Sequence, residues 1–313
     1  ILFDFYELGL GNPIGISAEQ AKGLGDLLDE VVKHLPKTSE QAEKDEGKLK
    51  IAVVGRPNAG KSSIVNKILG EDRVVVSNVA GTTRDAIDTA VEIEGQKYIF
   101  TDTAGIRRKS KVDDEIEKYS VMRAKMAIER SDVCVIMIDA TSGFTEQDSK
   151  VAGLAMEQGK AAIIAVNKWD LVEKDGKTMD SYRKSLMKDF SFMPFAPIIF
   201  ISAKTGQRVE KLLAAVDEVY ANASFRVPTG ELNDLIGDAV RMQEPPSYLG
   251  RRMRVFFSSQ VGICPPLFVL HVNSEDLLHF SYQRYLENTI RRAYDFSGTP
   301  IKIVVREKKD DEE

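Results

Sequence analysis

Cysteine and histidine are scarce in this sequence, and their scarcity excludes two kinds of site. The 313 residues include two cysteines, Cys134 and Cys264, and three histidines. Neither a CxxC pair nor a Cys/His spacing of the kind that holds zinc occurs. Cys134 lies within the apolar run DVCVIMIDA, where cysteine behaves as a small core residue. We therefore expect no disulfide and no metal site built from these side chains.

Long apolar runs and a large charge excess are also missing. No run approaches the roughly 20 apolar residues that a membrane-spanning helix needs, so we expect no membrane partner and a cytoplasmic protein. The net charge of −5 gives no global case for binding nucleic acid, and any such surface must be local. The apolar fraction of 43% suits a chain with a buried core.

A short pattern occurs twice in the chain. ISAEQAKGLGDLL at 16–28 returns as ISAKTGQRVEKLL at 201–213, and each copy predicts a strand end, a Ser-Ala loop and an amphipathic helix. Residues 36–48 have almost no apolar side chains and predict a linker. We expect residues 1–35 to be the end of a domain whose other parts, including any phosphate loop, are not in this sequence.

Between residues 49 and 224, short apolar runs alternate with stretches of helical periodicity. The runs predict strands buried on both faces at 50–54, 97–102, 132–140, 160–167 and 196–202. The intervening stretches predict helices near 62–69, 115–130, 146–158, 179–190 and 207–220. Residues 88–95 predict an antiparallel edge strand in a hairpin with 97–102. The alternation predicts an α/β fold with a mostly parallel, doubly wound sheet.

The pattern changes after residue 224. It predicts helices at 229–243 and 281–295, with strands at 252–261, 266–273 and 300–307. The order α-β-β-α-β predicts a small α+β domain, and residues 308–313 form a charged tail.

A phosphate-binding loop follows the first of these strands. GxxxxGK[ST] between a strand and a helix consists here of Gly55, Arg56, Pro57, Asn58, Ala59, Gly60, Lys61 and Ser62, with Ser63 next on the helix. The glycines let backbone N–H groups surround phosphate oxygens, and the helix adds its N-terminal dipole. We expect Lys61 to reach the β- and γ-phosphates and Ser62 to bind Mg²⁺.

A second motif, Asp102-Thr103-Ala104-Gly105, ends the strand at 97–102. A carboxylate at this end of a sheet strand is placed to hold Mg²⁺ through a water molecule. Gly105 would let a backbone N–H approach the γ-phosphate.

Two further motifs predict recognition of the base. Asn167-Lys168-Trp169-Asp170 follows the strand at 160–167, and Ser202-Ala203-Lys204 follows the strand at 196–202. The carboxylate of Asp170 can accept from the N1–H and the exocyclic amine of guanine, a pair of donors that adenine lacks. We expect Asn167 to tie this loop to the phosphate loop, the stem of Lys168 to cover the base, and the Ser-Ala-Lys turn to donate a backbone N–H to the guanine carbonyl.

GRPNAGKS, GTTRD, DTAG, NKWD and SAK together resemble GTPases of the Era/MnmE-like group. The partial repeat at 1–35 and the ending YQRYLENTIRRAYDFSGTPIKIVVR resemble the Der (EngA) family of bacterial GTPases, over essentially the whole chain. This resemblance implies a remnant of a first G domain at 1–35, a Ras-like P-loop G domain at 49–224 and a KH-like domain at 225–307. It also implies a monomer that hydrolyses GTP and assists assembly of the large ribosomal subunit, with its rRNA as partner.

The resemblance further implies a switch segment at 74–88, where Thr83, next to Thr82, would join Ser62 and Asp102 at Mg²⁺. Ile106 stands where Ras-like GTPases carry a water-orienting glutamine, and isoleucine cannot hydrogen-bond water. Similarity to MnmE-like enzymes implies K⁺ in compensation. Its ligands would be the side chain of Asn58 and the backbone carbonyls of Ser77, Val79 and Thr82.

Direct clamping of single-stranded RNA by the last domain is in doubt, because no GxxG occurs in residues 225–313. Local basic residues at the edge of this domain, Arg241, Arg251, Arg252 and Arg254, predict RNA contact instead. In the G domain Arg107, Arg108, Lys109 and Lys111 form a second basic run, for which a solvated surface loop is the favoured interpretation and RNA contact the alternative. Three alternatives stay open at this point. They are a related GTPase acting on tRNA or small-subunit RNA, a nucleotide-gated binding module with negligible turnover, and a phosphate-loop kinase, for which no acceptor site is visible.

Overall fold

The structure is a computed structural model that describes residues 14–15, 47–70, 74–79, 88–101, 116–248 and 250–307. Its contacts divide the chain into two units, residues 1–47 and 48–313. The second unit is described below. Most of the predicted remnant at 1–35, most of the linker and the charged tail lie outside the described residues.

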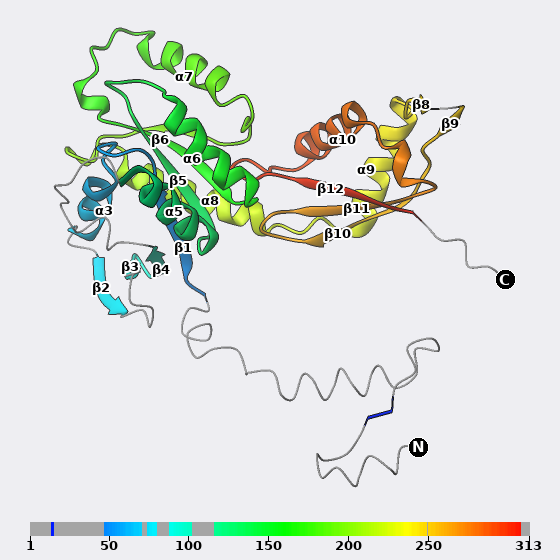
Figure 1. Ribbon diagram of the computed structural model, residues 1–313, viewed down its shortest axis with the longest axis horizontal. Helices are drawn as coiled ribbons and strands as arrows, with labels where there is room; N and C mark the ends of the chain where they lie inside the picture. The colour runs from blue at the N-terminus through cyan, green and yellow to red at the C-terminus, as the bar shows by residue number, and fades with distance from the viewer. Residues whose placement is uncertain are drawn as a thin grey trace. The chain divides into compact units, whose positions relative to one another are not determined.

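A seven-stranded sheet forms the larger part of the second unit, in the order β2-β3-β4-β1-β5-β6-β7 (Figure 1). The strands are β1 (Leu49–Val54), β2 (Val74–Val79), β3 (Asp88–Ile93), β4 (Gln96–Phe100), β5 (Val133–Asp139), β6 (Ala161–Asn167) and β7 (Ile198–Phe200). From β4 to β7 all neighbours run parallel, whereas β2, β3 and β4 pair antiparallel. The predicted doubly wound α/β sheet is therefore confirmed.

Two strand predictions need correction. Residues 88–95 were expected at the sheet edge, but β3 pairs with β2 on one side and β4 on the other. The edge belongs to β2, whose β-branched run Val74-Val75-Val76 favours a strand although it lies in the predicted switch segment. The strand predicted at 196–202 is shorter, because β7 pairs with β6 over only three residues.

Helices cover both faces of the sheet, as its strands require. They are α3 (Lys61–Leu69), α5 (Ile116–Glu129), α6 (Glu146–Glu157), α7 (Thr178–Asp189) and α8 (Val209–Ser224), with a short 3₁₀ helix η2 (Trp169–Leu171). Alternate residues of β5 enter different cores: Val133, Val135 and Met137 pack with α3 and α8, and the residues between them pack with α5, α6 and α7. Every residue of β5 is buried, which explains its continuous apolar run.

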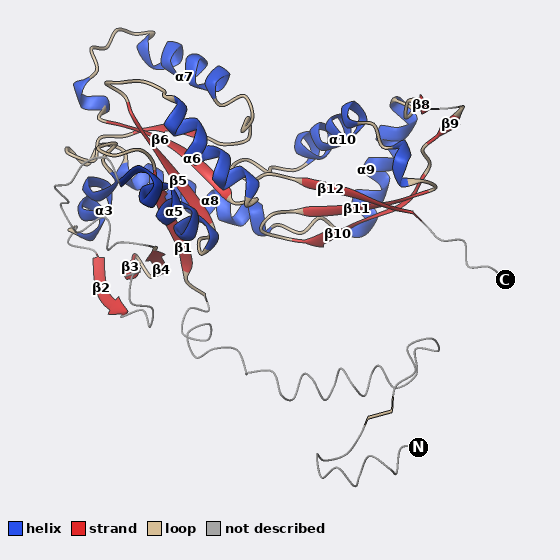
Figure 2. Cartoon of the chain, in the orientation of Figure 1, coloured by secondary structure: helices blue, strands red, loops and turns tan. Residues whose placement is uncertain are grey.

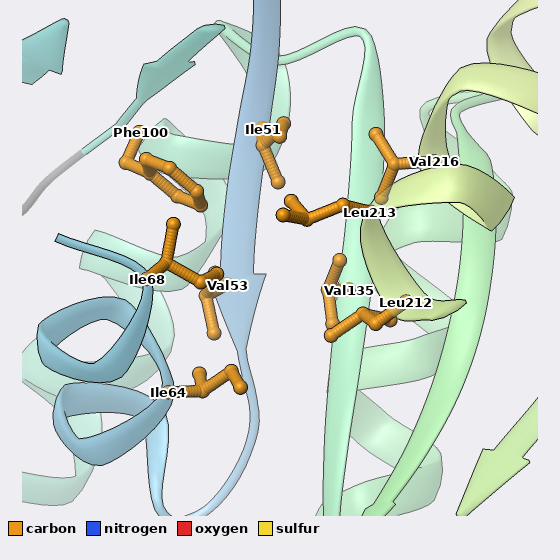
Figure 3. Close-up of a pocket in the computed structure, with 9 residues that line it drawn as sticks. All are labelled: Ile51, Val53, Ile64, Ile68, Phe100, Val135, Leu212, Leu213 and Val216. Atoms are coloured by element: carbon orange, nitrogen blue, oxygen red, sulfur yellow. The ribbon is translucent and has the colours of Figure 1, made fainter. Parts of the chain in front are cut away.

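A small apolar pocket lies between the sheet and the two helices α3 and α8. The nine side chains drawn in Figure 3 line it: Ile51, Val53, Ile64, Ile68, Phe100, Val135, Leu212, Leu213 and Val216. Its volume of about 10 Å³ is near the lower limit for one water molecule. Because none of its lining residues belongs to a predicted nucleotide loop, we interpret it as a packing gap in the core.

The C-terminal part has the predicted α-β-β-α-β order with one extra hairpin (Figure 2). Its elements are α9 (Thr229–Met242), the hairpin β8 (Ser247–Tyr248) and β9 (Arg251–Arg252), β10 (Val255–Gly262), β11 (Leu267–Val272), the 3₁₀ helix η3 (Glu275–Leu277), α10 (Phe280–Ala293) and β12 (Lys302–Glu307). The sheet order is β10-β11-β12. Helices α9 and α10 pack on the face that carries Phe268, Leu270 and Ile303.

Backbone hydrogen bonds join this part to the larger sheet. The N–H of Ala162 donates to the carbonyl of Gly298 at 2.7 Å, and the N–H of Gly298 donates to the carbonyl of Phe195 at 2.7 Å. The guanidinium of Arg291 lies over the ring of Phe195, with 5.3 Å between its carbon and the ring centroid. Gly298 thus continues the ladder at the amino end of β6, opposite the edge where β6 ends at Asn167.

Candidate nucleotide-binding site

The predicted nucleotide loops meet because their strands are parallel. Strands β1, β4, β5, β6 and β7 point the same way, so the loops that follow them share one edge of the sheet. Ligands of open α/β sheets bind at this carboxyl edge. The phosphate loop follows β1, and the two base-recognition segments follow β6 and β7.

The phosphate loop is closely packed at Gly60, which begins α3 with a φ of 101°. A Cβ at this position would lie 2.0 Å from Nδ2 of Asn167, so only glycine fits without displacing that side chain. Pro57 and Asn58 form an exposed turn, Ala59 is buried, and Asn58 has a φ of 61°. Helix α3 has no acidic residue in its first turn, which leaves its N-terminal dipole available to an anion.

The side chain of Lys61 binds back to the start of the phosphate loop. Its ammonium donates to the carbonyls of Gly55 and Arg56, at 2.8 Å each. Burial lowers the pKa of Lys61 to about 8, since a charged amine loses solvation there. Ser62 is half-buried on the first turn of α3 and Ser63 is exposed.

Asn167 joins three segments that are distant in sequence. Its Nδ2 donates to the carbonyl of Ala59 at 2.8 Å, and its Oδ1 accepts from the N–H of Ala203 at 2.9 Å. The side chain is 2% exposed, so both bonds are shielded from water. The phosphate loop, the Asn-Lys-Trp-Asp loop and the Ser-Ala-Lys turn are therefore fastened to one another.

Asp170 presents a buried acceptor beside these loops. Within the described part of the chain its Oδ1 has no hydrogen-bond partner. Trp169 next to it is 2% exposed and packs against Phe200 and Tyr182, with centroid distances of 4.4 and 5.6 Å. A buried carboxylate oxygen without a donor is unfavourable, so this atom suits a ligand that brings one.

The remaining base-recognition residues have defined places. Lys168 adopts a φ of 62°, and its ammonium binds Oδ2 of Asp139 at 2.6 Å. The hydroxyl of Ser202 accepts from the N–H of Thr205 at 3.1 Å, which closes the turn. Ala203 is buried and Lys204 is exposed.

Part of the predicted site cannot be placed. Thr82, Thr83 and the segment Asp102, Thr103, Ala104, Gly105 and Ile106 lie outside the described residues. Ser77 and Val79 lie in β2, paired with Ala90 and Asp88 of β3. Of the residues predicted to bind Mg²⁺ or K⁺, the side chains described are those of Ser62 and Asn58.

Sequence reasoning missed Asp139. Burial alone would raise the pKa of this carboxyl, but hydrogen bonds from Lys168 and Thr141 outweigh that effect and lower it. The pattern that would have found it was present, because Asp139 ends the strand β5 just as Asp102 follows β4.

Comparison with known proteins gives the family. A GTPase Der from Agathobacter rectalis is 52% identical over 311 residues, which cover 99% of this chain and 70% of that protein. A GTPase Der from Thermoanaerobacter sp. is 55% identical over 306 residues, 98% of this chain and 69% of that protein. The chain belongs to the Der family of GTPases.

Two family descriptions match consecutive parts of this Der-family chain. "50S ribosome-binding GTPase" matches residues 50–168, and "KH-domain-like of EngA bacterial GTPase enzymes, C-terminal" matches residues 226–306. The predicted family, the P-loop G domain and the KH-like domain are thereby confirmed. As a Der-family GTPase the chain is a GTP-binding protein.

Comparison with solved structures finds Era among the similar chains. Era in complex with MgGDPNP and nucleotides 1506–1542 of 16S ribosomal RNA is 21% identical, with a TM-score of 0.44, over 84% of this chain and 93% of that one. Among the described residues, no helix has the length and apolar character that crossing a bilayer requires.

Proposed function

We propose that this chain binds GTP at the carboxyl edge of its seven-stranded sheet and hydrolyses it to GDP and phosphate. The observation that carries the proposal is the double contact of Asn167 with Ala59 and Ala203. It fastens the loop that would hold the phosphates to the two segments that would read the base. A single nucleotide can then contact all three at once.

Base selection rests on Asp170. Its buried Oδ1 is an acceptor without a donor in the described structure, and guanine offers N1–H beside an exocyclic amine. The ring of Trp169 packs against those of Tyr182 and Phe200, and this packing fixes the backbone next to Asp170. Adenine would leave the carboxylate unpaired, which costs far more than a missing contact.

Phosphate binding rests on Lys61 and the start of α3. The ammonium of Lys61 would exchange the carbonyls of Gly55 and Arg56 for phosphate oxygens, gaining a charged partner for a buried charge. Backbone N–H groups of the loop and of the first turn of α3 would complete the cradle.

The residues present fit a cation site only in part, because two predicted ligands of Mg²⁺ are outside the described residues. Ser62 would supply one oxygen, with Thr83 and, through water, Asp102; Mg²⁺ there offsets the charge of the β- and γ-phosphates. Asn58, in the exposed turn of the loop, would supply an oxygen for K⁺ together with carbonyls of Ser77, Val79 and Thr82. K⁺ held there would supply positive charge to the phosphates during hydrolysis.

The wider role that we propose is assembly of the large ribosomal subunit, with its rRNA as partner. The match of residues 50–168 to a family described as 50S ribosome-binding GTPases supports it. The candidate RNA surface comprises Arg251 and Arg252 of β9 with Arg254 beyond it, all exposed, and Arg241 in the last turn of α9. Arg241 and Arg252 are paired with Asp238 and Glu244, and RNA phosphates would compete with those exposed carboxylates.

Phosphate release from GTP and from ATP, measured with the purified chain and Mg²⁺, tests the enzymatic part. We expect release from GTP alone. Tight GTP binding without release would favour the nucleotide-gated binding module, and equal use of ATP would contradict the assignment of Asp170.

Co-sedimentation with separated ribosomal subunits tests the wider role. We expect binding to the large subunit that differs between GDP and a non-hydrolysable GTP analogue. Binding to the small subunit alone would contradict the proposal and favour the small-subunit alternative.

A further inference from the structure

Residues 139–148, which run from the last residue of β5 through the connecting turn into the first turn of α6, contain none of the recognised nucleotide motifs but contact two segments that do. Its first residue, Asp139, holds Lys168 of the base loop. Its last residue, Asp148, faces Arg56 of the phosphate loop. We name these residues the β5–α6 turn.

Hydrogen bonds to both of its oxygens fix the orientation of the Asp139 carboxylate, which contacts the base loop. Oδ1 of Asp139 accepts from the N–H and the hydroxyl of Thr141, at 2.9 and 2.7 Å, which leaves Oδ2 for the ammonium of Lys168 at 2.6 Å. The N–H of Ala140 donates to the carbonyl of Asn167 at 2.9 Å. Because the carboxylate cannot rotate without losing these bonds, the position of the Lys168 ammonium is set by the turn.

The contact with the phosphate loop centres on Arg56, whose ion pair with Asp148 is more deeply buried than that of Lys168 with Asp139. Nη2 of Arg56 donates to the hydroxyl of Ser142 and, at 3.4 Å, to the carbonyl of Gly143. Nε of Arg56 lies 3.9 Å from Oδ1 of Asp148, whose side chain is 0% exposed. The same Arg56 offers its carbonyl to Lys61, so the turn acts on the residue that supports the phosphate-binding lysine.

The two carboxylate oxygens of Asp148 have different partners, and one of them faces Arg56. Its Oδ2 accepts from the N–H and the hydroxyl of Thr145, at 3.0 and 2.8 Å, in the capping box that begins α6. Its Oδ1 has no hydrogen-bond partner in the described structure. A buried carboxylate with one unsatisfied oxygen depends on a nearby cation, and the guanidinium of Arg56 is in that position.

We propose that Asp139 and Asp148 are positioning residues for nucleotide binding, which hold the base loop through Lys168 and the phosphate loop through Arg56. The inference rests on the proposed binding of GTP at this site. Asp139 then acts on the part of the nucleotide that GTP and GMP share. Asp148 acts on the β- and γ-phosphates, which GMP lacks.

The test compares Asp139→Asn, Asp148→Asn and wild type, as the full chain, by titration with GTP and by competition with GMP. In Asp139→Asn an amide nitrogen would face the ammonium of Lys168, and we expect about tenfold weaker binding of both nucleotides. In Asp148→Asn we expect about tenfold weaker binding of GTP and less than twofold change for GMP. Asp175→Asn is the matched control, because this exposed carboxylate also accepts from the hydroxyl of a threonine three residues later, Thr178, and we expect affinities within about twofold of wild type.

Double variants distinguish an effect of Asp139 through Lys168 from a non-specific disturbance of the nucleotide-binding site. If Asp139 acts through Lys168, adding Asp139→Asn to Lys168→Ala gives no further loss, because the ammonium that Asp139 holds is already absent. Additive losses would overturn the inference for Asp139. Equal losses of GTP and GMP in Asp148→Asn would overturn it for Asp148.

The role of Asp148 can be tested even if the Asp148→Asn protein does not fold. Should Asp148→Asn fail to fold, Arg56→Gln breaks the same contact from its less buried partner, whose side chain is 15% exposed, and must weaken GTP selectively. Unchanged affinities in a folded Arg56→Gln protein would refute the role of Asp148. Failure of the wild type to bind GTP would instead refute the proposed function.

Discussion

The amide nitrogen of Asn167 donates a 2.8 Å hydrogen bond to the carbonyl oxygen of Ala59, a residue 108 positions earlier in the chain. Replacing Asn167 with Asp puts an oxygen against that carbonyl and removes the donor. We expect GTP affinity to fall at least about tenfold, because a buried polar contact becomes a repulsion. Isothermal titration of GTP measures this.

The control for Asn167→Asp is Asn66→Asp on α3, whose side chain is exposed. It makes the same chemical change close to the phosphate loop without touching Ala59. Wild-type affinity in Asn167→Asp, or an equal loss in Asn66→Asp, would contradict the role of Asn167 as the link between the loops.

Most elements of the fold were predictable because their determinants are local. The apolar run of β5 and the strand-loop-helix setting of Gly55 to Ser62 are each contained in a few consecutive residues. The edge strand was misassigned because the β-branched residues at 74–76 favour a strand, whereas the polar residues that follow favour a loop. Pairing partners decide such a case, and they are distant in sequence.

The contacts that support the site were much harder to predict. Lys168 meets Asp139 only because β5 and β6 are neighbours, and Arg56 meets Asp148 only because α6 begins beside the phosphate loop. Charged residues of this kind are numerous in the sequence. Which of them pair depends on the completed sheet rather than on any local pattern.

Base selectivity should change when Asp170 is replaced by Asn. The amide presents a donor where guanine also has a donor, but xanthine carries an oxygen at the matching position. We therefore expect weaker GTP binding and improved binding of xanthosine triphosphate, measured by competition with a fluorescent guanine nucleotide. Asp175→Asn serves as control, and an unchanged GTP-to-XTP ratio in Asp170→Asn would show that this carboxylate does not read the base.

Monovalent cations should affect turnover if Asn58 binds K⁺. We expect faster phosphate release in K⁺ than in Na⁺ at equal ionic strength, and loss of the difference in Asn58→Ala. A rate difference that persists in Asn58→Ala would place the cation elsewhere, and equal rates in the wild type would remove the K⁺ proposal.

The lowered pKa of Lys61 predicts how GTP binding depends on pH. Phosphates bind the protonated amine, and in the free protein this amine loses its proton as pH rises through about 8. Affinity for GTP should therefore fall by up to about tenfold between pH 7 and pH 9, and binding should take up protons in this range. An unshifted lysine would give no such fall below pH 9.

Guanosine is the control for that titration, because it shares the base and its ionisation but lacks phosphates. Its affinity should change less than that of GTP over the same pH range. Parallel curves for the two ligands would assign the pH dependence to the base rather than to Lys61.

Gly298 provides a test of how the KH-like part is joined to the sheet. Its φ is 80°, and a Cβ there would lie 2.2 Å from Cγ2 of Val219 on α8. Alanine would combine an unfavourable backbone conformation with overpacking, and would strain the hydrogen bonds to Ala162 and Phe195. We expect Gly298→Ala to lower the free energy of unfolding by about 2–4 kcal/mol.

Gly153→Ala is the matched control, because a Cβ in this position of α6 meets nothing within 4 Å, and helix propensity favours alanine by about 1 kcal/mol. Denaturant unfolding measures the free energy of unfolding of both variants. Equal values for the two would mean that the side chain of Val219 can move away at little cost and that the junction at Gly298 is not closely packed.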